Sequence, residues 1–270
     1  MRWISALRCR WFPEALALLV CLMLAPALAL GESFVFGQTE HGRDLECIRL
    51  GEENAPRSIL MVFAIHGFEG ARDRDGEVLV EIARRVIAHY EQKPEELEGF
   101  TLYIVPCANP DGLIEGVGED DVGRLNANGI NINRDFSQKW RKIGSPRDRT
   151  GEAPFATAEA RAIRDLVEEL KPTYGIDVHG WINGVYGDYD FAHAFWESFG
   201  FPIRELSGSG MLAQWMQTQV EAAIMIELPH RPGREGYVDD NVPRLIEGLN
   251  IWMRTVKKPP PSAQTGKGVV

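Results

Sequence analysis

The chain has 270 residues, of which 44% are hydrophobic, 25% charged and 9% aromatic. This composition is typical of a folded globular protein and excludes a disordered, collagen-like or disulfide-scaffold chain. The net charge of −10 at pH 7 argues against a nucleic-acid partner bound through a basic face. We expect one catalytic domain over residues 30–256, since α/β domains often reach this length undivided.

Residues 1–29 have the parts of a secretory signal peptide. Arg2, Arg8 and Arg10 form a basic region, an apolar stretch follows, and Ala27 and Ala29 form an A-x-A cleavage pattern. The apolar stretch is short for a membrane span, which needs about twenty apolar residues. We therefore expect cleavage, no stable membrane insertion afterwards, and a periplasmic or secreted protein. An uncleaved membrane anchor is the alternative.

The exported chain would keep two cysteines, Cys47 and Cys107. An oxidising compartment allows them to form a disulfide, but the sequence alone does not place the two thiols within bonding distance. Two buried, unpaired cysteines are an equally good interpretation.

Apolar runs and helical periodicity predict strands and helices in alternation along the chain. In chain order, we predict strands at 33–36, 45–50 and 59–65, a helix at 76–91, a strand at 101–105, a helix at 156–170, strands at 174–178 and 222–226, and a helix at 242–256. Asn109–Gly112 is predicted to form a turn, residues 113–153 a long irregular segment of functional type, and 257–270 a disordered tail. This order predicts a three-layer α/β/α sandwich around a mostly parallel mixed sheet.

Polar side chains follow several of the predicted strands at the point where each strand ends. His66 and Glu69 follow the strand at 59–65, and His179 follows the strand at 174–178. Ligands bind at the carboxyl ends of strands in such sheets, so these side chains are expected to converge. Two imidazoles and a carboxylate, with a fourth position left to water, are typical of a catalytic zinc site. A histidine and a glutamate three residues apart are weak support alone, so the placement after buried strands carries the prediction.

Glu227 ends the strand at 222–226 in the apolar setting Ile-Glu-Leu-Pro. Such a carboxyl group either has a raised pKa or needs a cation nearby. Beside a metal-bound water it would act as a general base. The alternative is that Glu227 and His179 are surface residues at the ends of their strands.

The long segment supplies two arginines, Arg124 and Arg134, in an Asn- and Gly-rich stretch. Guanidinium groups match carboxylates with two parallel hydrogen bonds, so these residues are candidates for contacts with an anionic substrate. Two solvated surface arginines are the alternative.

Together these motifs resemble the zinc metallocarboxypeptidases, with the bacterial murein peptide amidase branch most similar. The matching motifs, which extend from about Gly42 to Pro229, are His66-Gly-Phe-Glu69, Asn109-Pro-Asp-Gly112, Arg124-x-Asn126, Asn133-Arg134, His179 and Glu227-Leu-Pro. The resemblance implies a carboxypeptidase-like fold and one Zn²⁺ bound by the two histidines and Glu69. It also implies that Glu227 is the general base and that Arg124 stabilises the oxyanion. Asn133 and Arg134 would hold the terminal carboxylate of the substrate.

Three departures from the family pattern affect these expectations. Asn131 stands where the family usually has an aspartate that orients the first zinc histidine, which is expected to reduce zinc affinity or water activation. Asp135 replaces an asparagine and would place negative charge near the carboxylate pocket. The family tyrosine that covers the substrate has no counterpart between Tyr189 and Glu227; Tyr186, Tyr189 and Tyr237 are candidates by proximity in sequence alone.

The predicted function is hydrolysis of a peptide amide bond by a zinc-activated water and a glutamate base, on a peptide or muropeptide substrate outside the cytoplasm. A zinc-dependent deacylase of N-acyl amino acids is one alternative, and a catalytically inactive zinc- or peptide-binding relative is another. The oligomeric state cannot be read from the sequence.

Overall fold

A computed structural model describes residues 31–71, 74–115 and 123–257. The predicted signal peptide lies outside the described residues, and so does the predicted tail apart from Lys257. None of the helices in the described part of the chain combines the length and apolar character needed to cross a membrane.

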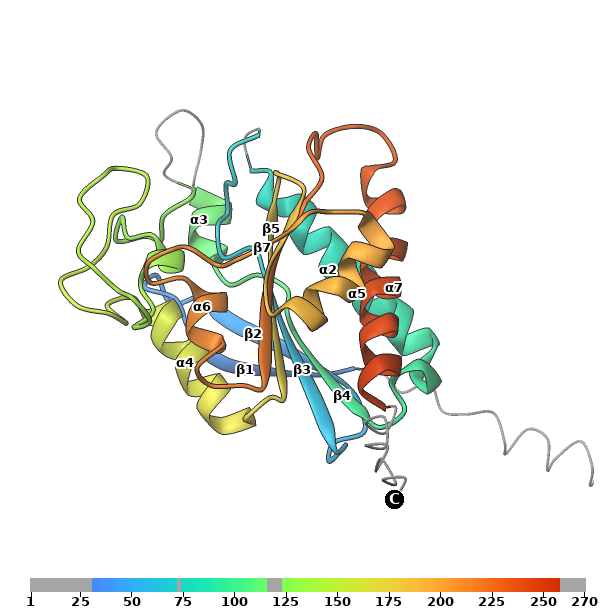
Figure 1. The fold of residues 1–270 in the computed structure, drawn as a ribbon. Coiled ribbons are helices and arrows are strands. Elements are labelled where there is room, and N and C mark those ends of the chain that lie inside the picture. Colours follow the sequence, from blue (N-terminus) through green and yellow to red (C-terminus); the bar gives the residue numbers. More distant parts are fainter. Residues whose placement is uncertain (1–30, 72–73, 116–122, 258–270) are drawn as a thin grey trace, which may run out of the picture.

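A mixed sheet of eight strands forms the middle layer of the molecule (Figure 1). Its strands are β1 (Glu32–Gln38), β2 (Asp44–Gly51), β3 (Arg57–Phe63), β4 (Phe100–Val105), β5 (Tyr174–Gly180), β6 (Gly184–Gly187), β7 (Ile203–Arg204) and β8 (Ala222–Leu228). They lie in the order β1-β2-β4-β3-β5-β8-β6-β7. The four central strands, β4, β3, β5 and β8, are parallel, whereas β1, β2 and β6 pair antiparallel to their inner neighbours. The carboxyl ends of the four parallel strands therefore meet at one edge of the sheet.

Helices cover both faces of the sheet, which confirms the predicted three-layer sandwich (Figure 1). On one face, α2 (Gly76–Gln92), α5 (Tyr189–Phe199) and α7 (Tyr237–Lys257) bury a large apolar cluster against the strands. On the other face, α4 (Ala158–Leu170) and α6 (Leu212–Met216) bury a second cluster. The short helices η1 (Pro94–Leu97), α3 (Pro110–Glu115) and η3 (Ile132–Arg134) lie in the connections.

The predicted strands and helices all appear in the structure, with differences at their ends. The strand predicted at 59–65 ends at Phe63, because Ala64 adopts a left-handed backbone conformation with φ 49° and redirects the chain. The turn predicted at Asn109–Gly112 is the start of α3, whose first turn is capped by Asn109 Oδ1 accepting from Gly112 N at 2.9 Å. The last helix begins at Tyr237, five residues before the predicted start, and contains Pro243 at an exposed position.

The two described cysteines are both free. Cys47 packs into the cluster under α4 and α6, whereas Cys107 packs against the cluster under α2, α5 and α7. The two thiols therefore lie on opposite faces of the sheet, which explains why they do not pair. Burial raises the pKa of each thiol to about 12, so neither is reactive at neutral pH.

Candidate metal and active site

The structure brings the three predicted metal ligands together at the carboxyl ends of β3 and β5. Nδ1 of His66 lies 3.0 Å from one carboxylate oxygen of Glu69, and Nδ1 of His179 lies 3.0 Å from the other. One ligand atom from each residue lies within 4.8 Å of the other two. All three side chains are almost fully buried. Two imidazole nitrogens and one carboxylate oxygen at this spacing form a donor set that fits Zn²⁺.

A close backbone approach shapes the loop that carries His66 and Glu69. A Cβ added at Gly67 would lie 2.2 Å from the backbone nitrogen of Leu113, so only glycine fits there. The loop consequently packs onto α3 and turns both ligand side chains toward His179.

A second group of described side chains with metal-like spacing consists of His41, Asp111 and Glu115. The guanidinium of Arg43 already forms ion pairs with both of its carboxylates. We therefore assign the metal site to His66, Glu69 and His179.

A pocket of about 440 Å³ opens beside the metal ligands. Its lining includes Glu69, Arg124, Arg147, Trp181, Ile182, Glu227, His230 and Arg231. Glu227 is the strand partner of His179 in the parallel β5–β8 register, so their side chains stand next to each other on one face of the sheet. Oε2 of Glu227 is buried and has no hydrogen-bond partner among the described groups.

Arg124 reaches the pocket from the long segment before η3. Its guanidinium donates to Glu69 Oε2 at 3.3 Å, and its side chain is about one-tenth exposed. The buried Nε of Arg124 has no hydrogen-bond partner among the described groups. The predicted base and the predicted oxyanion residue thus line the same pocket as the metal ligands.

The environment sets the charges of these groups in the metal-free protein. Burial raises the pKa of Glu227 to about 7, while burial and the cation of Arg124 lower that of His66 to about 4. Burial alone would raise the pKa of Glu69 and lower that of His179. The neighbouring opposite charges reverse both effects, so the pKa of Glu69 falls well below its ordinary value and that of His179 rises well above it.

Asn131 occupies the position next to the first histidine ligand, as predicted. Its Oδ1 lies 3.0 Å from His66 Nε2, and its Nδ2 donates to Arg147 O at 3.1 Å and to Asp148 Oδ1 at 3.2 Å. The amide thus supplies an acceptor to His66 and two donors that a carboxylate would lack. This network explains why asparagine fits here.

Asn133 and Arg134 are engaged in contacts within the protein. Asn133 is buried, and its Oδ1 accepts from Leu212 N at 2.8 Å. The Arg134 guanidinium donates to Asn133 O at 2.8 Å and lies 3.1 Å from Asp148 Oδ1. The lining of the pocket beside the metal ligands does not include either residue.

The carboxylate of Asp135 is directed to the start of α4. Its Oδ2 accepts from the backbone nitrogen of Thr157 at 2.8 Å and from its hydroxyl at 2.9 Å. Asp135 therefore caps the start of α4. The geometry does not support the expectation that its negative charge lies in a pocket for the substrate carboxylate.

The three candidate tyrosines make contacts away from the metal ligands. Tyr186 accepts from Arg204 at 2.9 Å, Tyr189 is 65% exposed on α5, and Tyr237 donates to Pro229 O at 2.7 Å. None of the three belongs to the lining of the pocket beside the metal site.

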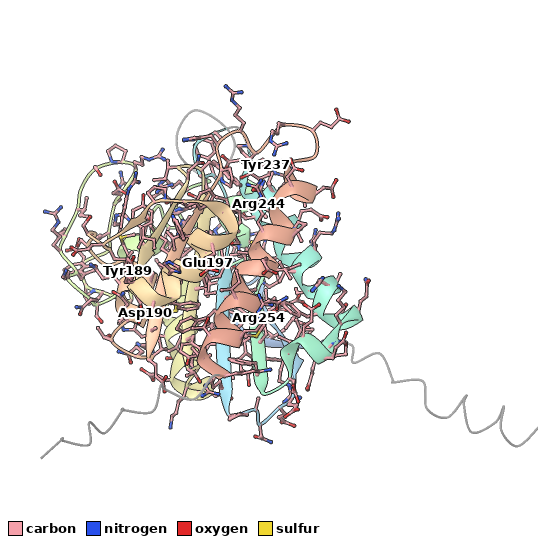
Figure 2. The ribbon with its side chains drawn as sticks, turned by 45° about the vertical axis from the view of Figure 1, so that its right-hand side comes forward. Tyr189, Asp190, Glu197, Tyr237, Arg244 and Arg254 are labelled. Atoms are coloured by element: carbon pink, nitrogen blue, oxygen red, sulfur yellow. The ribbon has the colours of Figure 1, made fainter. Side chains whose placement is uncertain are left out.

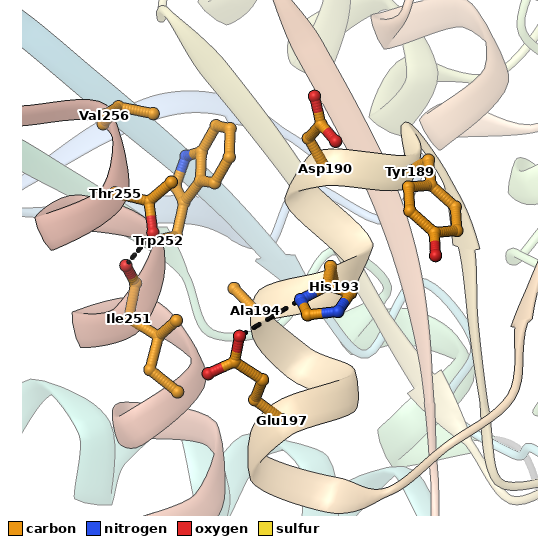
Figure 3. A pocket seen from close by; sticks show the side chains of 9 residues that line it. All are labelled: Tyr189, Asp190, His193, Ala194, Glu197, Ile251, Trp252, Thr255 and Val256. Atoms are coloured by element: carbon orange, nitrogen blue, oxygen red, sulfur yellow. Dashed lines mark hydrogen bonds and ion pairs between the residues drawn. The ribbon is translucent and has the colours of Figure 1, made fainter. Parts of the chain in front are cut away.

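Another pocket, of about 490 Å³, lies between α5 and α7, on the sheet face that these two helices cover (Figure 3). Tyr189, His193 and Glu197 of α5 face Ile251 and Thr255 of α7 across it. Figure 2 shows the same two helices side by side, with Glu197 on α5 and Arg254 on α7. This pocket contains none of the predicted site residues.

Sequence reasoning missed Asp75, which is buried at the start of α2 beside the site. Its carboxylate accepts from Glu69 N at 2.6 Å, from Ala71 N at 2.7 Å and from Trp181 Nε1 at 2.8 Å. It therefore connects the loop of one metal ligand to an aromatic wall of the pocket. The position of Asp75 just before a predicted helix could have indicated a helix cap. Nothing in the sequence indicated its contact with Trp181, 106 positions away.

A His–Glu–His donor set at the carboxyl ends of parallel strands, beside a glutamate with a buried carboxyl oxygen, is the arrangement of a metallohydrolase. A family model described as zinc carboxypeptidase matches residues 29–230. The chain belongs to this family, which confirms the resemblance drawn from its motifs.

Two curated relatives illustrate the similarity. Bacteriocin BCN5 of Clostridium perfringens is 32% identical over 212 residues, which cover 76% of this chain and 23% of the relative. Murein peptide amidase A of Escherichia coli is 29% identical over 90 residues, covering 28% of this chain and 35% of the relative. The chain thus spans about a quarter to a third of the length of these relatives.

Solved structures share the fold at low sequence identity. Bovine thrombin-activatable fibrinolysis inhibitor superimposes with a TM-score of 0.71 at 16% identity, covering 90% of this chain and 96% of that one. Murein-tripeptide amidase MpaA from Escherichia coli superimposes with a TM-score of 0.59 at 18% identity, covering 85% and 93%. These likenesses confirm the carboxypeptidase-like α/β fold.

Proposed function

We propose that this protein is a zinc-dependent metallopeptidase, a carboxypeptidase or amidase that hydrolyses a peptide amide bond. The observation that carries the proposal is the convergence of His66, Glu69 and His179 within 4.8 Å, next to a pocket lined by Glu227 and Arg124. When bound by these three ligands, zinc supplies a Lewis acid that polarises a carbonyl and makes water a better nucleophile at neutral pH.

Glu227 is proposed to move the proton of the reaction. Burial raises its pKa to about 7, so at neutral pH it can accept a proton from the attacking water and return it to the leaving amine. Its buried Oε2 has no competing partner among the described groups.

Arg124 is proposed to donate to the oxyanion that develops on the scissile carbonyl. It lines the pocket with a guanidinium held by Glu69, so a donor is fixed in place before the substrate binds. Arg134 is proposed to hold the substrate carboxylate, whereas the buried amide of Asn133 is already engaged with Leu212 N and His179. For Arg134 this role requires the substrate to compete with Asp148, which lies 3.1 Å from its guanidinium.

We propose a cell-wall peptide as the substrate. Three arginines, Arg124, Arg147 and Arg231, line the pocket beside Glu69 and Glu227, so cationic side chains outnumber anionic ones there in a chain whose net charge is −10. Such a cleft favours peptides that carry several carboxylates, as murein peptides do. The similarity to murein peptide amidase A supports the same choice.

The substrate proposal is tested with zinc-loaded protein and three peptides: one with a free C-terminus, the same peptide amidated, and a murein tripeptide. Preferential cleavage of the murein tripeptide supports the proposal. Cleavage of the simple peptide alone would favour a general carboxypeptidase, and no cleavage of any peptide by a zinc-loaded chain would contradict peptidase activity.

Export remains a proposal as well, supported by the sequence of residues 1–29. N-terminal sequencing of the protein recovered from a bacterial periplasm tests it. A new N-terminus near residue 30 is expected, and an intact Met1 in the cytoplasmic fraction would contradict export.

A further inference from the structure

Asp177 lies on β5 two residues before the metal ligand His179. Side chains alternate along a strand, so these two project from the same face of the sheet. Asp177 is completely buried, and its Oδ2 lies 2.9 Å from Nε2 of His179. The carboxylate therefore stands behind the imidazole, at the nitrogen opposite the one that faces Glu69.

Neither oxygen of Asp177 has a hydrogen-bond partner in the described part of the chain, so its 2.9 Å approach to His179 is an ion-pair contact. A buried carboxylate without a donor is strongly unfavourable, so its position calls for a partner. The imidazole of His179, 2.9 Å away, offers one whenever Nε2 carries a proton.

The other polar neighbour of this nitrogen cannot take that proton. Nδ2 of Asn133 lies 3.2 Å from His179 Nε2, and the amide is held in this orientation because its Oδ1 accepts from Leu212 N. An amide nitrogen is a donor, not an acceptor. Asp177 is therefore the acceptor available at Nε2 among the described groups.

We propose that Asp177 is a positioning residue of the metal site, the carboxylate that fixes the ring and tautomer of His179. By accepting from Nε2–H, it leaves the lone pair of Nδ1 directed at the metal. The inference rests on the proposed zinc function and adds a residue to which neither the motifs nor the comparisons gave a role.

The assignment also accounts for Asn131. His66 has only an amide oxygen at its Nε2, and that amide is tied to Arg147 and Asp148. The negative charge expected behind the first histidine is absent there, but the second histidine has a carboxylate in the equivalent place. The site therefore still has one histidine ligand backed by a carboxylate, but that ligand is His179 and not His66.

The test compares zinc dissociation constants of the wild-type protein and Asp177→Asn by competition with a chelator. Loss of such a partner typically weakens metal binding about 10–100-fold, and this is the expected change. Glu159→Gln is the matched control, because it removes another buried carboxylate, on α4, and should bind zinc like the wild type. Equal affinities of Asp177→Asn and wild type would overturn the proposal.

This design separates the inference from the function it rests on. A wild-type chain that binds no zinc would overturn the proposed function, and the role of Asp177 with it. If the wild-type chain binds zinc and Asp177→Asn binds it equally tightly, the role of Asp177 is overturned but the proposed zinc function is not.

A measurement on the wild type keeps the proposal testable if Asp177→Asn fails to fold. In the zinc-loaded protein labelled with ¹⁵N-histidine, His179 should carry its proton on Nε2. That proton should resonate downfield of the Nε2 proton of His66, since a carboxylate is a stronger acceptor than the amide of Asn131. A His179 signal upfield of the His66 signal, or no proton on Nε2, would overturn the proposal.

Discussion

Trp181 Nε1 donates a 2.8 Å hydrogen bond to Asp75 Oδ2, which ties the wall of the pocket to the N-terminus of α2. The same carboxylate accepts from the backbone nitrogens of Glu69 and Ala71. One buried side chain thereby fixes a metal ligand's backbone and an aromatic ring that are far apart in sequence. Negative charge at the start of a helix is additionally favourable.

Asp75→Ala is therefore expected to destabilise the protein by about 2–4 kcal/mol, because it leaves several donors without their acceptor. Chemical denaturation of the metal-free protein measures this. Asp165→Ala, at an exposed position of α4, is the control and should change stability by no more than about 0.5 kcal/mol. Equal stabilities of the two variants would show that Asp75 does not hold the loop.

Glu227→Gln is expected to reduce turnover by about 10²–10⁴-fold, since the amide can neither accept nor return the proton. Zinc content should stay the same because Glu227 is not among the three ligands. Turnover on the preferred peptide and metal analysis of both proteins measure the two effects. Full turnover in this variant would show that Glu227 is not the base.

The sheet and the metal ligands could be predicted because their signals are local. Apolar runs mark β3, β4 and β8, and β5 is apolar before His179 except for Asp177; polar residues at the ends of β3, β5 and β8 meet at one edge of the sheet. Strands β6 and β7 have four and two residues, too few for a periodic pattern, so they escaped prediction. Strand β6 pairs with the edge that β8 presents, and β7 pairs with β6.

The supporting contacts of the site depend on tertiary structure. The alternation of side chains along a strand would have placed Asp177 beside His179, yet the absence of other donors around it follows only from packing. In the same way, the internal contacts of Arg134 with Asp148 depend on how residues 135–150 fold back, which no sequence pattern specified.

The raised pKa of Glu227 predicts a pH-dependent stability of the metal-free protein. Burial raises this pKa from 4.5 to about 7, so the protonated form is favoured in the folded state. That stabilisation is present below pH 4.5 and is lost as pH rises through about 7, at a cost of about 3 kcal/mol. Comparing Glu227→Gln with wild type at each pH cancels the other titrating groups. The variant should gain relative stability between these pH values; a constant difference would contradict the raised pKa.

Zinc binding is predicted to release a proton from His179 at pH 6.5, the ordinary pKa of a histidine. Burial alone would lower the pKa of His179, but Asp177 and Glu69 raise it well above 6.5, so the protonated form dominates at that pH. His66 contributes no proton there, because burial and Arg124 lower its pKa to about 4. A ligand must lose its proton to bind metal, so zinc affinity should fall as the pH is lowered. Calorimetry in buffers of different ionisation enthalpy detects the protons released at pH 6.5; no release would contradict the raised pKa of His179.

Asn131→Asp tests why this site carries an amide behind His66. The substitution removes the donors to Arg147 O and Asp148 Oδ1 and places a carboxylate about 3 Å from that of Asp148. We expect the metal-free variant to be destabilised by about 1–3 kcal/mol, because two like charges then meet in a partly buried network. The double variant Asn131→Asp, Asp148→Asn restores one donor–acceptor pair and should recover most of the loss. Denaturation of all four proteins gives the coupling energy; additive effects would show that Asp148 does not determine the residue at position 131.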